Sequence, residues 1–394
     1  GVGRPAGADR LARSLRVLAE KRPVDIFIKV DLKTAFQKMD RGMAVSGLLE
    51  QAPELSNSFQ AWYGGSAKHW WRTAAGGFRE ITSHTGFDQG CPLAAAAFSA
   101  GLKKALEPFW TRAIALDPNV RLYAYLDDMY VVCSSQASLA VLCVLEECLT
   151  AASLQLKPSK TQVWCPSGVH AIPPTLPGKR VATLGVLGAA LKTSGDTEEA
   201  PVAAHGAGTA LSEATDRLKQ LWTKLQQLGQ AGLSRQASAA LLRTYAGSAS
   251  QHALRLERAT QEHTEAYDKQ VLTCWGDLLE RPVTEQGGLT EQDLHRLGLP
   301  LKLGGLGAQL ASTRRNAAPW SSWAATLEGI ARDLGYEVLE ELLEEVPHLR
   351  QELEQLRAGL NEQGAEVPPD TTLGAALKKA GRQSSLVGNI QKKT

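Results

Sequence analysis

The sequence predicts an α+β fold in which an antiparallel sheet with packed helices precedes a helical C-terminal half. Strand-forming residues surround Asp127 and Asp128 within 122–133, which predicts a β-hairpin with both carboxylates at its tip. The apolar run 26–30 predicts a second strand, which ends at Asp31. From Leu211 onward, leucines recur at three- and four-residue spacing, as is typical of amphipathic helices.

Composition narrows the class of protein. The chain has 394 residues and 43% hydrophobic content, which is enough for two or three domains with real cores. None of the six cysteines forms a Cys-x-x-Cys pair, so we expect neither a disulfide framework nor a zinc site. The absence of an apolar run of about 18 residues and of a signal peptide predicts a soluble, intracellular protein without a membrane partner. A net charge of +2 does not by itself indicate a nucleic-acid partner.

The first predicted element is a helix over 8–20. Leu11, Leu15 and Leu18 share one of its faces, and its arginines are interpreted as the solvated face. Pro23 ends this helix before the acidic strand begins.

Two elements follow the acidic strand. Residues 41–62 are predicted to be helical, and 67–73 with 78–83 form a predicted β-hairpin. The tryptophans of this region are interpreted as packing residues, and stacking on a base is the alternative for an exposed ring. They are Trp62, Trp70 and Trp71.

A glycine-containing loop over 85–91 leads into a helix that starts at Pro92, a residue suited to the first helical position. Another helix is predicted over 139–156, followed by a turn that contains Lys160. A last strand pair, 181–184 and 186–191, completes the first half.

The candidate catalytic residues are carboxylates at the ends of predicted strands. Asp127 and Asp128 repel each other, and solvent, a nearby cation or a divalent metal must compensate that repulsion. An isolated Asp-Asp is most often only a turn. The second acidic strand end, at Asp31, favours a two-metal phosphoryl-transfer site, because neighbouring strands can bring carboxylates onto cations roughly 3.5 to 4 Å apart.

Five segments, taken together, resemble the motifs of a reverse transcriptase of the non-LTR (LINE-like) retrotransposon kind. In chain order they are 30–36, 86–93, 125–128, 156–161 and 184–188. The resemblance implies the palm of a right-hand polymerase followed by a helical thumb. It also implies an RNA template, a DNA primer and deoxynucleoside triphosphates as partners, and a nuclear location.

The resemblance assigns roles to single residues. Asp31 and Asp127 would hold two Mg²⁺ ions, with Mn²⁺ as an alternative, and Asp128 would be a weaker ligand. Lys160 would donate a proton to the departing pyrophosphate. The other implied residues are Phe36 as the gate that excludes a 2′-hydroxyl, Gln89, Gly90 and Tyr125 at the substrate, and Leu184 and Gly185 in the primer grip. From the residues alone, Phe36 is more simply a core aromatic and Lys160 a solvated charge.

The resemblance and the residue patterns together predict five segments of the chain. They are a palm with partial fingers (1–191), a linker (192–210), a thumb and post-thumb region (211–330), a helical hairpin or coiled coil (331–360) and a disordered basic tail (361–394). The glutamates of 331–360 are interpreted as a solvated face.

Two departures from the family's pattern leave alternatives open. Asp88 stands where many relatives have a basic residue, and no segment resembles the fingers motifs that clamp the triphosphate. One alternative is therefore an inactive or truncated palm–thumb remnant that at most binds nucleic acid. Another is an RNA-templated RNA polymerase, against which Phe36 argues because its ring should clash with ribose. The sequence indicates neither the natural template nor the oligomeric state.

Overall fold

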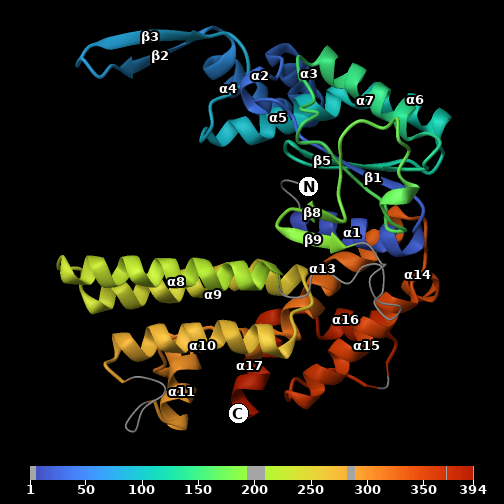
Figure 1. Ribbon diagram of the computed structural model, residues 1–394. Coiled ribbons are helices and arrows are strands. Elements are labelled where there is room, and N and C mark those ends of the chain that lie inside the picture. The colour runs from blue at the N-terminus through green and yellow to red at the C-terminus, as the bar shows by residue number, and fades with distance from the viewer. Residues whose placement is uncertain (1–5, 193–208, 282–288, 370, 394) are drawn as a thin grey trace. The chain divides into compact units, whose positions relative to one another are not determined.

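The computed structural model describes residues 6–192, 209–281, 289–369 and 371–393, and divides them into two compact units (Figure 1). The first unit holds 22–184 and the start of helix α1 (Gly7–Lys21). The second holds the rest of that helix, 185–192 and the described residues from 209 onward. Helices and mostly antiparallel strands are interleaved up to Lys192, and the described elements from Thr209 onward are helical, which confirms the predicted α+β class.

A five-stranded sheet lies in the first unit, in the order β4-β5-β1-β6-β7. The pairings of β1 with β5 and β6, and of β4 with β5, are antiparallel as predicted, whereas β7 pairs with β6 in parallel. The strands are β1 (Ile26–Val30), β4 (Arg121–Tyr125), β5 (Asp128–Cys133), β6 (Gln162–Trp164) and β7 (Lys179–Arg180).

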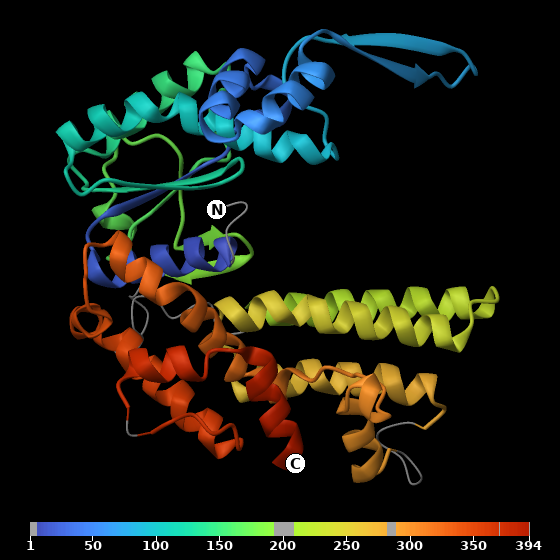
Figure 2. The same ribbon diagram turned by 180° about the vertical axis from the view of Figure 1, so that it is seen from behind.

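Two further pairs of strands form small separate sheets. They are β2 (Ala67–Arg72) with β3 (Phe78–Ser83), and β8 (Thr183–Val186) with β9 (Ala189–Lys192). Figures 1 and 2 show β2 and β3 extending away from the helices of their own unit. The predicted hairpin around 74–77 is confirmed.

The helices of the first unit are α2 (Ala35–Lys38), α3 (Arg41–Gln51), α4 (Pro53–Tyr63), α5 (Pro92–Ala105), α6 (Glu107–Leu116), α7 (Ser138–Ala151) and a 3₁₀ turn, η1 (Val169–Ala171). The prediction that 41–62 is helical is confirmed except for a break at Ala52, because Pro53 lacks a backbone N–H and starts a new helix. The helix predicted over 139–156 ends at Ala151, since the following residues leave it to pair with the segment after β1.

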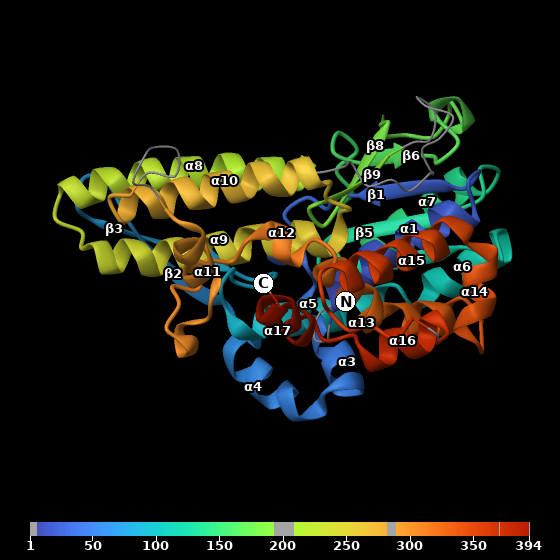
Figure 3. The ribbon, with the colours of Figure 1, turned by 90° about the horizontal axis from the view of Figure 1, so that it is seen from below.

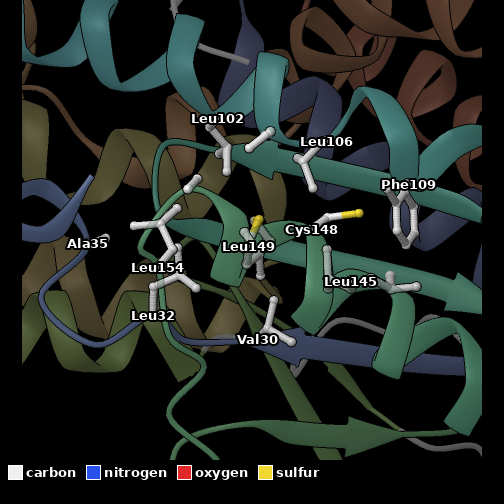
Figure 4. Packing of buried hydrophobic residues seen from close by; sticks show 14 of the residues in the cluster. Val30, Leu32, Ala35, Leu102, Leu106, Phe109, Leu145, Cys148, Leu149 and Leu154 are labelled. Carbon is white, nitrogen blue, oxygen red and sulfur yellow. The ribbon is translucent and has the colours of Figure 1, made fainter. Parts of the chain in front are cut away.

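One face of the sheet supplies the core of the first unit. Alternate residues of β1 and β5, such as Val30 and Val131, are buried against α5, α6 and α7. Figure 4 shows Val30 and Leu32 among leucines of these helices and Phe109. Burial of this face holds the strands in register, because a one-residue slip would turn every apolar side chain outward.

The second unit is helical apart from β9 and part of β8 within its described residues. Its helices are α8 (Thr209–Gln230), α9 (Arg235–Leu256), α10 (Gln261–Leu278), α11 (Glu291–Gly298), η2 (Leu301–Leu303), α12 (Ala311–Arg314), α13 (Ala317–Asp333), α14 (Leu339–Glu345), α15 (Pro347–Glu362), α16 (Leu373–Lys379) and α17 (Gln383–Lys393). Figure 3 shows α8, α9 and α10 side by side, and their leucines share one core with Trp275.

The predicted disordered tail is wrong for its described residues. Helices α16 and α17 pack on α13 through Leu377, Leu386 and Ile390, which belong to a second core. The segment 361–394 is polar and glycine-rich overall, and for that reason its apolar residues at helical spacing were not recognised as a buried helix face. The predicted linker lies almost wholly outside the described residues, since β9 ends at Lys192 and α8 begins at Thr209.

Two arginines of α1 are buried, which corrects their interpretation as a solvated face. Arg13 and Arg16 are 1% and 6% exposed, and both pair with Glu352 of α15, which is itself 5% exposed. The Trp323 indole N–H donates to the same carboxylate over 3.1 Å. Burial acts to raise the pKa of Glu352, but the guanidinium groups and the indole outweigh it and hold that pKa well below its usual range. This carboxylate is therefore charged and structural.

Among the described residues, none of the helices has the length and apolarity needed to cross a membrane.

Candidate active site

Lys29, Asp31 and Asp128 lie on the side of the sheet opposite the helical core. Val30 and Leu32 point into that core, so the alternation of a strand turns Lys29 and Asp31 to the other face. In β5, Met129 likewise points into the core and Asp128 away from it. The second face is also buried at Phe27 and Val132, and it becomes polar only toward the end that holds Lys29, Asp31 and Asp128.

Strand register sets Asp31 opposite Asp128. The antiparallel ladder of β1 and β5 pairs Lys29 with Tyr130 and Val30 with Met129. Asp31, the next residue along, follows β1 at the position that faces Asp128. The register therefore places two acidic residues that are far apart in sequence next to each other at the end of this ladder, and their metal-binding role stays a prediction.

Asp127 occupies the tight turn rather than a strand. The ladder closes with Tyr125 opposite Asp128, so Leu126 and Asp127 are the two turn residues. Leu126 has φ 56°, a left-handed conformation that is costly for a residue with a branched side chain. Asp127 is exposed at the tip, whereas Asp128 opens β5, which corrects the expectation that both carboxylates form the turn.

Each of two carboxylates faces a lysine ammonium group. Lys160 Nζ lies 3.6 Å from Asp31 Oδ2, and Lys29 Nζ lies 3.6 Å from Asp128 Oδ1. All four side chains remain partly exposed to solvent. The lysines compensate the repulsion that adjacent carboxylates would otherwise exert on the hairpin. Lys29 was not predicted, although its two-residue spacing from Asp31 places it on the same face.

Backbone pairing brings Lys160 to Asp31. Lys157 N donates to Asp31 O over 2.8 Å, and Leu32 forms a β-bridge with Leu156. A turn then closes with Lys160 N donating to Lys157 O over 2.9 Å. Lys160 is 58% exposed but close to a predicted metal ligand, so it is more than a distant surface charge.

Phe36 lies at the start of α2, half-buried. Its ring stacks on Phe98 of α5, with centroids 4.5 Å apart and an interplanar angle of 17°. Its carbonyl oxygen accepts a hydrogen bond from Phe87 N over 2.7 Å. Phe36 therefore combines a packing role with a position five residues beyond Asp31, and the structure is compatible with both interpretations of this ring.

Gly86 fixes the predicted substrate loop against Phe36. A Cβ at this position would lie 2.3 Å from Phe36 O and 2.2 Å from the carbonyl carbon of Gln37, and Gly86 also has φ +64°. Only glycine allows this close approach of two backbones. Gly86 belongs to the second of the five resembling segments, which predicts no role for this residue.

Arg41 joins three segments at the same place. Its Nε donates to Gly86 O over 2.9 Å, one Nη donates to Gly65 O over 2.7 Å, and its guanidinium lies over the Tyr63 ring. These contacts hold the end of α4 and the loop after β3 to the start of α3. The sequence carried no local signal for this role, because the partners are backbone atoms of distant segments.

The remaining predicted residues are placed as follows. Gln89 and Gly90 are exposed, and Gly90 has φ +93° with open space around it. Tyr125 is half-buried and faces Asp128 across the ladder. Leu184 is buried and Gly185 half-buried in β8. Their substrate and primer-grip roles stay predictions.

The donor set suits Mg²⁺ in kind. Asp31, Asp127 and Asp128 offer carboxylate oxygens, the donors that this ion prefers, at one partly solvated sheet edge. Over the described ranges, however, no group of three or more Asp, Glu, His or Cys side chains is close enough together to hold an ion. The two lysines already balance the charge of Asp31 and Asp128.

A family of known proteins matches the part of the chain that contains these residues. Residues 6–194 match the family described as reverse transcriptase (RNA-dependent DNA polymerase). This segment contains all the predicted carboxylates and both lysines. No curated protein matches the sequence.

Several solved telomerase structures are similar to the chain. Apo telomerase from Candida tropicalis shares 11% identity at a TM-score of 0.41, over 97% of this chain and 55% of that one. Telomerase from Candida albicans, in complex with a fragment of telomeric RNA, shares 11% identity at a TM-score of 0.38, over 84% and 54%. A C-terminally truncated C. tropicalis telomerase shares 14% identity at a TM-score of 0.33, over 47% and 38%. The chain thus spans about half the length of these telomerases or less.

Proposed function

We propose that this protein is an RNA-directed DNA polymerase of the non-LTR retrotransposon kind, which adds deoxynucleotides to a primer by two-metal phosphoryl transfer. The observation that carries the proposal is the register of β1 and β5, which sets Asp31 opposite Asp128 beside the turn that holds Asp127. The match of 6–194 to the reverse transcriptase family supports it. A nuclear location belongs to the same proposal.

In this proposal Asp31 and Asp127 hold the Mg²⁺ ions, with Mn²⁺ as a substitute, and Asp128 supports them as a weaker ligand. Bound ions of this type stabilise the charge that develops on the attacking and leaving oxygens of an in-line displacement. The lysines keep the carboxylates neutralised until substrate arrives.

Lys160 donates a proton to the departing pyrophosphate. Its ammonium lies 3.6 Å from the Asp31 carboxylate, and its 58% exposure leaves it accessible to a phosphate oxygen. The primer 3′-oxygen, whose proton passes to water, forms a bond to the α-phosphorus as the bond from that phosphorus to the bridging oxygen of the pyrophosphate breaks. The proton from Lys160 Nζ neutralises the charge that this oxygen acquires.

Other residues position the substrates. The Phe36 ring, held by its stack on Phe98, excludes a 2′-hydroxyl from the nucleotide pocket. Gln89, Gly90 and Tyr125 line the nascent base pair, and Leu184 and Gly185 belong to the primer grip. The substrates are an RNA template, a DNA primer and deoxynucleoside triphosphates.

Primer extension on poly(rA)/oligo(dT) with Mg²⁺ tests the proposal. Asp31→Asn and Asp127→Asn should each lower incorporation roughly a thousandfold, because each removes several kcal/mol of transition-state stabilisation. Asp216→Asn, which changes an exposed aspartate paired with Lys219 on α8, is the matched control and should retain activity. Extension that survives unchanged when Asp127 and Asp128 are both asparagine would refute the assignment.

A non-catalytic palm–thumb remnant is the second candidate. It is favoured by one observation: within the described parts of the chain, no three His, Cys, Asp or Glu side chains lie close enough together to hold an ion. A folded wild-type chain that incorporates no nucleotide with either Mg²⁺ or Mn²⁺, yet still binds RNA, would support this candidate. Measurable incorporation by the chain alone would exclude it.

A further inference from the structure

The β2–β3 hairpin exposes large aromatic side chains that the sequence analysis interpreted as packing residues. Trp70, Trp71 and Phe78 are 64%, 66% and 69% exposed, which corrects that interpretation for both tryptophans. Trp62, at the end of α4, is 72% exposed and is corrected as well. A soluble domain seldom leaves this many large rings uncovered on one ribbon, so they indicate an interaction surface.

The register of the hairpin sorts these rings onto opposite faces. Trp70 pairs with Glu80 and Arg72 pairs with Phe78, so these four residues lie on one side of the ribbon, which we call the Trp70 face. Trp71 lies on the opposite side. On the Trp70 face the two rings are diagonal neighbours, with their Cα atoms about 7 to 8 Å apart. Such a spacing presents two flat surfaces in succession along one line.

Positive charge accompanies the rings. Lys68 Nζ lies 2.9 Å from Glu80 Oε1, so these two charges largely cancel. Arg72 is exposed beside Phe78 and, within the described part of the chain, forms no ion pair. The Trp70 face therefore combines two stacking rings with one uncompensated guanidinium, which is the combination that binds bases and phosphates of a single strand.

The hairpin is tied to the loop that contains Gln89 and Gly90. Ser83 Oγ donates to Thr85 O over 3.2 Å, and His69 Nε2 lies 3.5 Å from Asp88 Oδ1. At its far end, Thr73 N donates to Gly77 O over 2.8 Å, and Gly76 has φ +87°, so the turn is well formed. The ribbon is thus an ordered extension of the proposed substrate loop.

We infer that the Trp70 face binds single-stranded RNA, which in the proposed polymerase is the template strand next to the nascent base pair. The identification of that strand as template rests on the proposed function. The stacking of bases on Trp70 and Phe78 and the contact of Arg72 with a phosphate are properties of the ribbon itself. This binding does not depend on base sequence, since every base has a flat face.

Binding of a fluorescein-labelled 20-nucleotide oligo(rU) to the full chain, followed by fluorescence anisotropy without metal or nucleotide, tests the inference. Trp70→Ala with Phe78→Ala should weaken binding about tenfold or more, since each stacked base contributes substantially to affinity. Trp71→Ala is the matched control: the same residue type, on the same strand and with equal exposure, but on the other face. It should bind within threefold of wild type.

The role of the Arg72 charge is tested by the dependence of RNA affinity on salt concentration. Arg72→Gln should reduce the slope of log affinity against log salt by about 0.7, the value for one phosphate contact on a single strand. Arg79→Gln, on the Trp71 face, should leave the slope unchanged. Thermal unfolding confirms that each variant is folded, and these exposed side chains lie outside the described cores.

The inference is overturned if the double variant binds oligo(rU) as wild type does, in which case the rings suit a protein partner. It is also overturned if Trp71→Ala loses as much affinity as the double variant. The two proposals fail separately. Asp216→Asn on α8 should keep wild-type affinity for oligo(rU), and a chain without polymerase activity can still lose RNA binding when the Trp70 face is changed.

Discussion

Gly86→Ala should disrupt the junction between the loop after β3 and the start of α2. The added Cβ would lie 2.2 Å from a backbone carbonyl carbon of Gln37 and 2.3 Å from two backbone oxygens. Ordinary contact begins at 3.4 Å, so the two segments must separate by about 1 Å. The residue also has φ +64°, which costs alanine about 1 kcal/mol or more. Overpacking adds about 1 to 3 kcal/mol, for a total of roughly 2 to 4 kcal/mol.

Gly76→Ala separates the two causes. Gly76 has φ +87°, but nothing lies within 4 Å of its added Cβ, so this variant has the backbone cost without the clash. We expect urea unfolding to give a loss of about 1 kcal/mol for Gly76→Ala and at least 1 kcal/mol more for Gly86→Ala. In primer extension, Gly86→Ala should lower the rate of incorporation up to a hundredfold, because it shifts Phe36 by about 1 Å. Equal stability of the two variants would refute the argument that backbone contact at Gly86 fixes the loop.

Two further predictions concern Glu352 and Phe36. Glu352→Gln should lower the free energy of unfolding at pH 7 by about 3 to 5 kcal/mol, because Arg13 and Arg16 would be left buried without a countercharge. The control is Glu354→Gln, an exposed change on the same helix, which should cost about 0.5 kcal/mol or less. The pKa of Glu352 in the folded protein is held below its ordinary value of 4.5. The carboxylate therefore stabilises the folded protein fully above pH 4.5, and this stabilisation is lost as the pH falls. In urea, the free energy of unfolding should fall less steeply with decreasing pH in Glu352→Gln than in wild type. Equal unfolding free energies for the two glutamine variants would contradict this account. Phe36→Val should raise the ratio of ribonucleotide to deoxynucleotide incorporation roughly 10- to 200-fold in competition assays, and an unchanged ratio would leave Phe36 as a packing residue only.

The sequence was sufficient to predict the parts of the site that depend on local signals. Apolar runs located β1 and the β4–β5 hairpin, and turn-forming aspartates located its tip. The pairing of Lys29 with Asp128 could not be predicted in the same way, because it depends on the register between strands about a hundred residues apart. Arg41 was missed for a related reason, since it binds carbonyl groups that come together only after folding.

Exposure and burial of single residues were the weakest predictions. Trp70 and Trp71 were interpreted as packing residues because tryptophan is usually buried, yet a two-stranded ribbon offers no core to cover them. Arg13 and Arg16 were interpreted as solvated because arginine usually is, yet a glutamate more than three hundred residues away makes their burial possible. In both cases the deciding partner, or its lack, is a tertiary property.

Lys160 and Lys29 face two of the three carboxylates at the acidic edge of the sheet, those of Asp31 and Asp128. In the proposed polymerase, a divalent ion that binds Asp31 or Asp128 would exchange with an ammonium group, and this competition would weaken the binding of free ions. A nucleoside triphosphate that carries its own ion offers the displaced ammonium a phosphate oxygen in return. In the proposed polymerase, the edge should consequently favour loading with the ion and its nucleotide together.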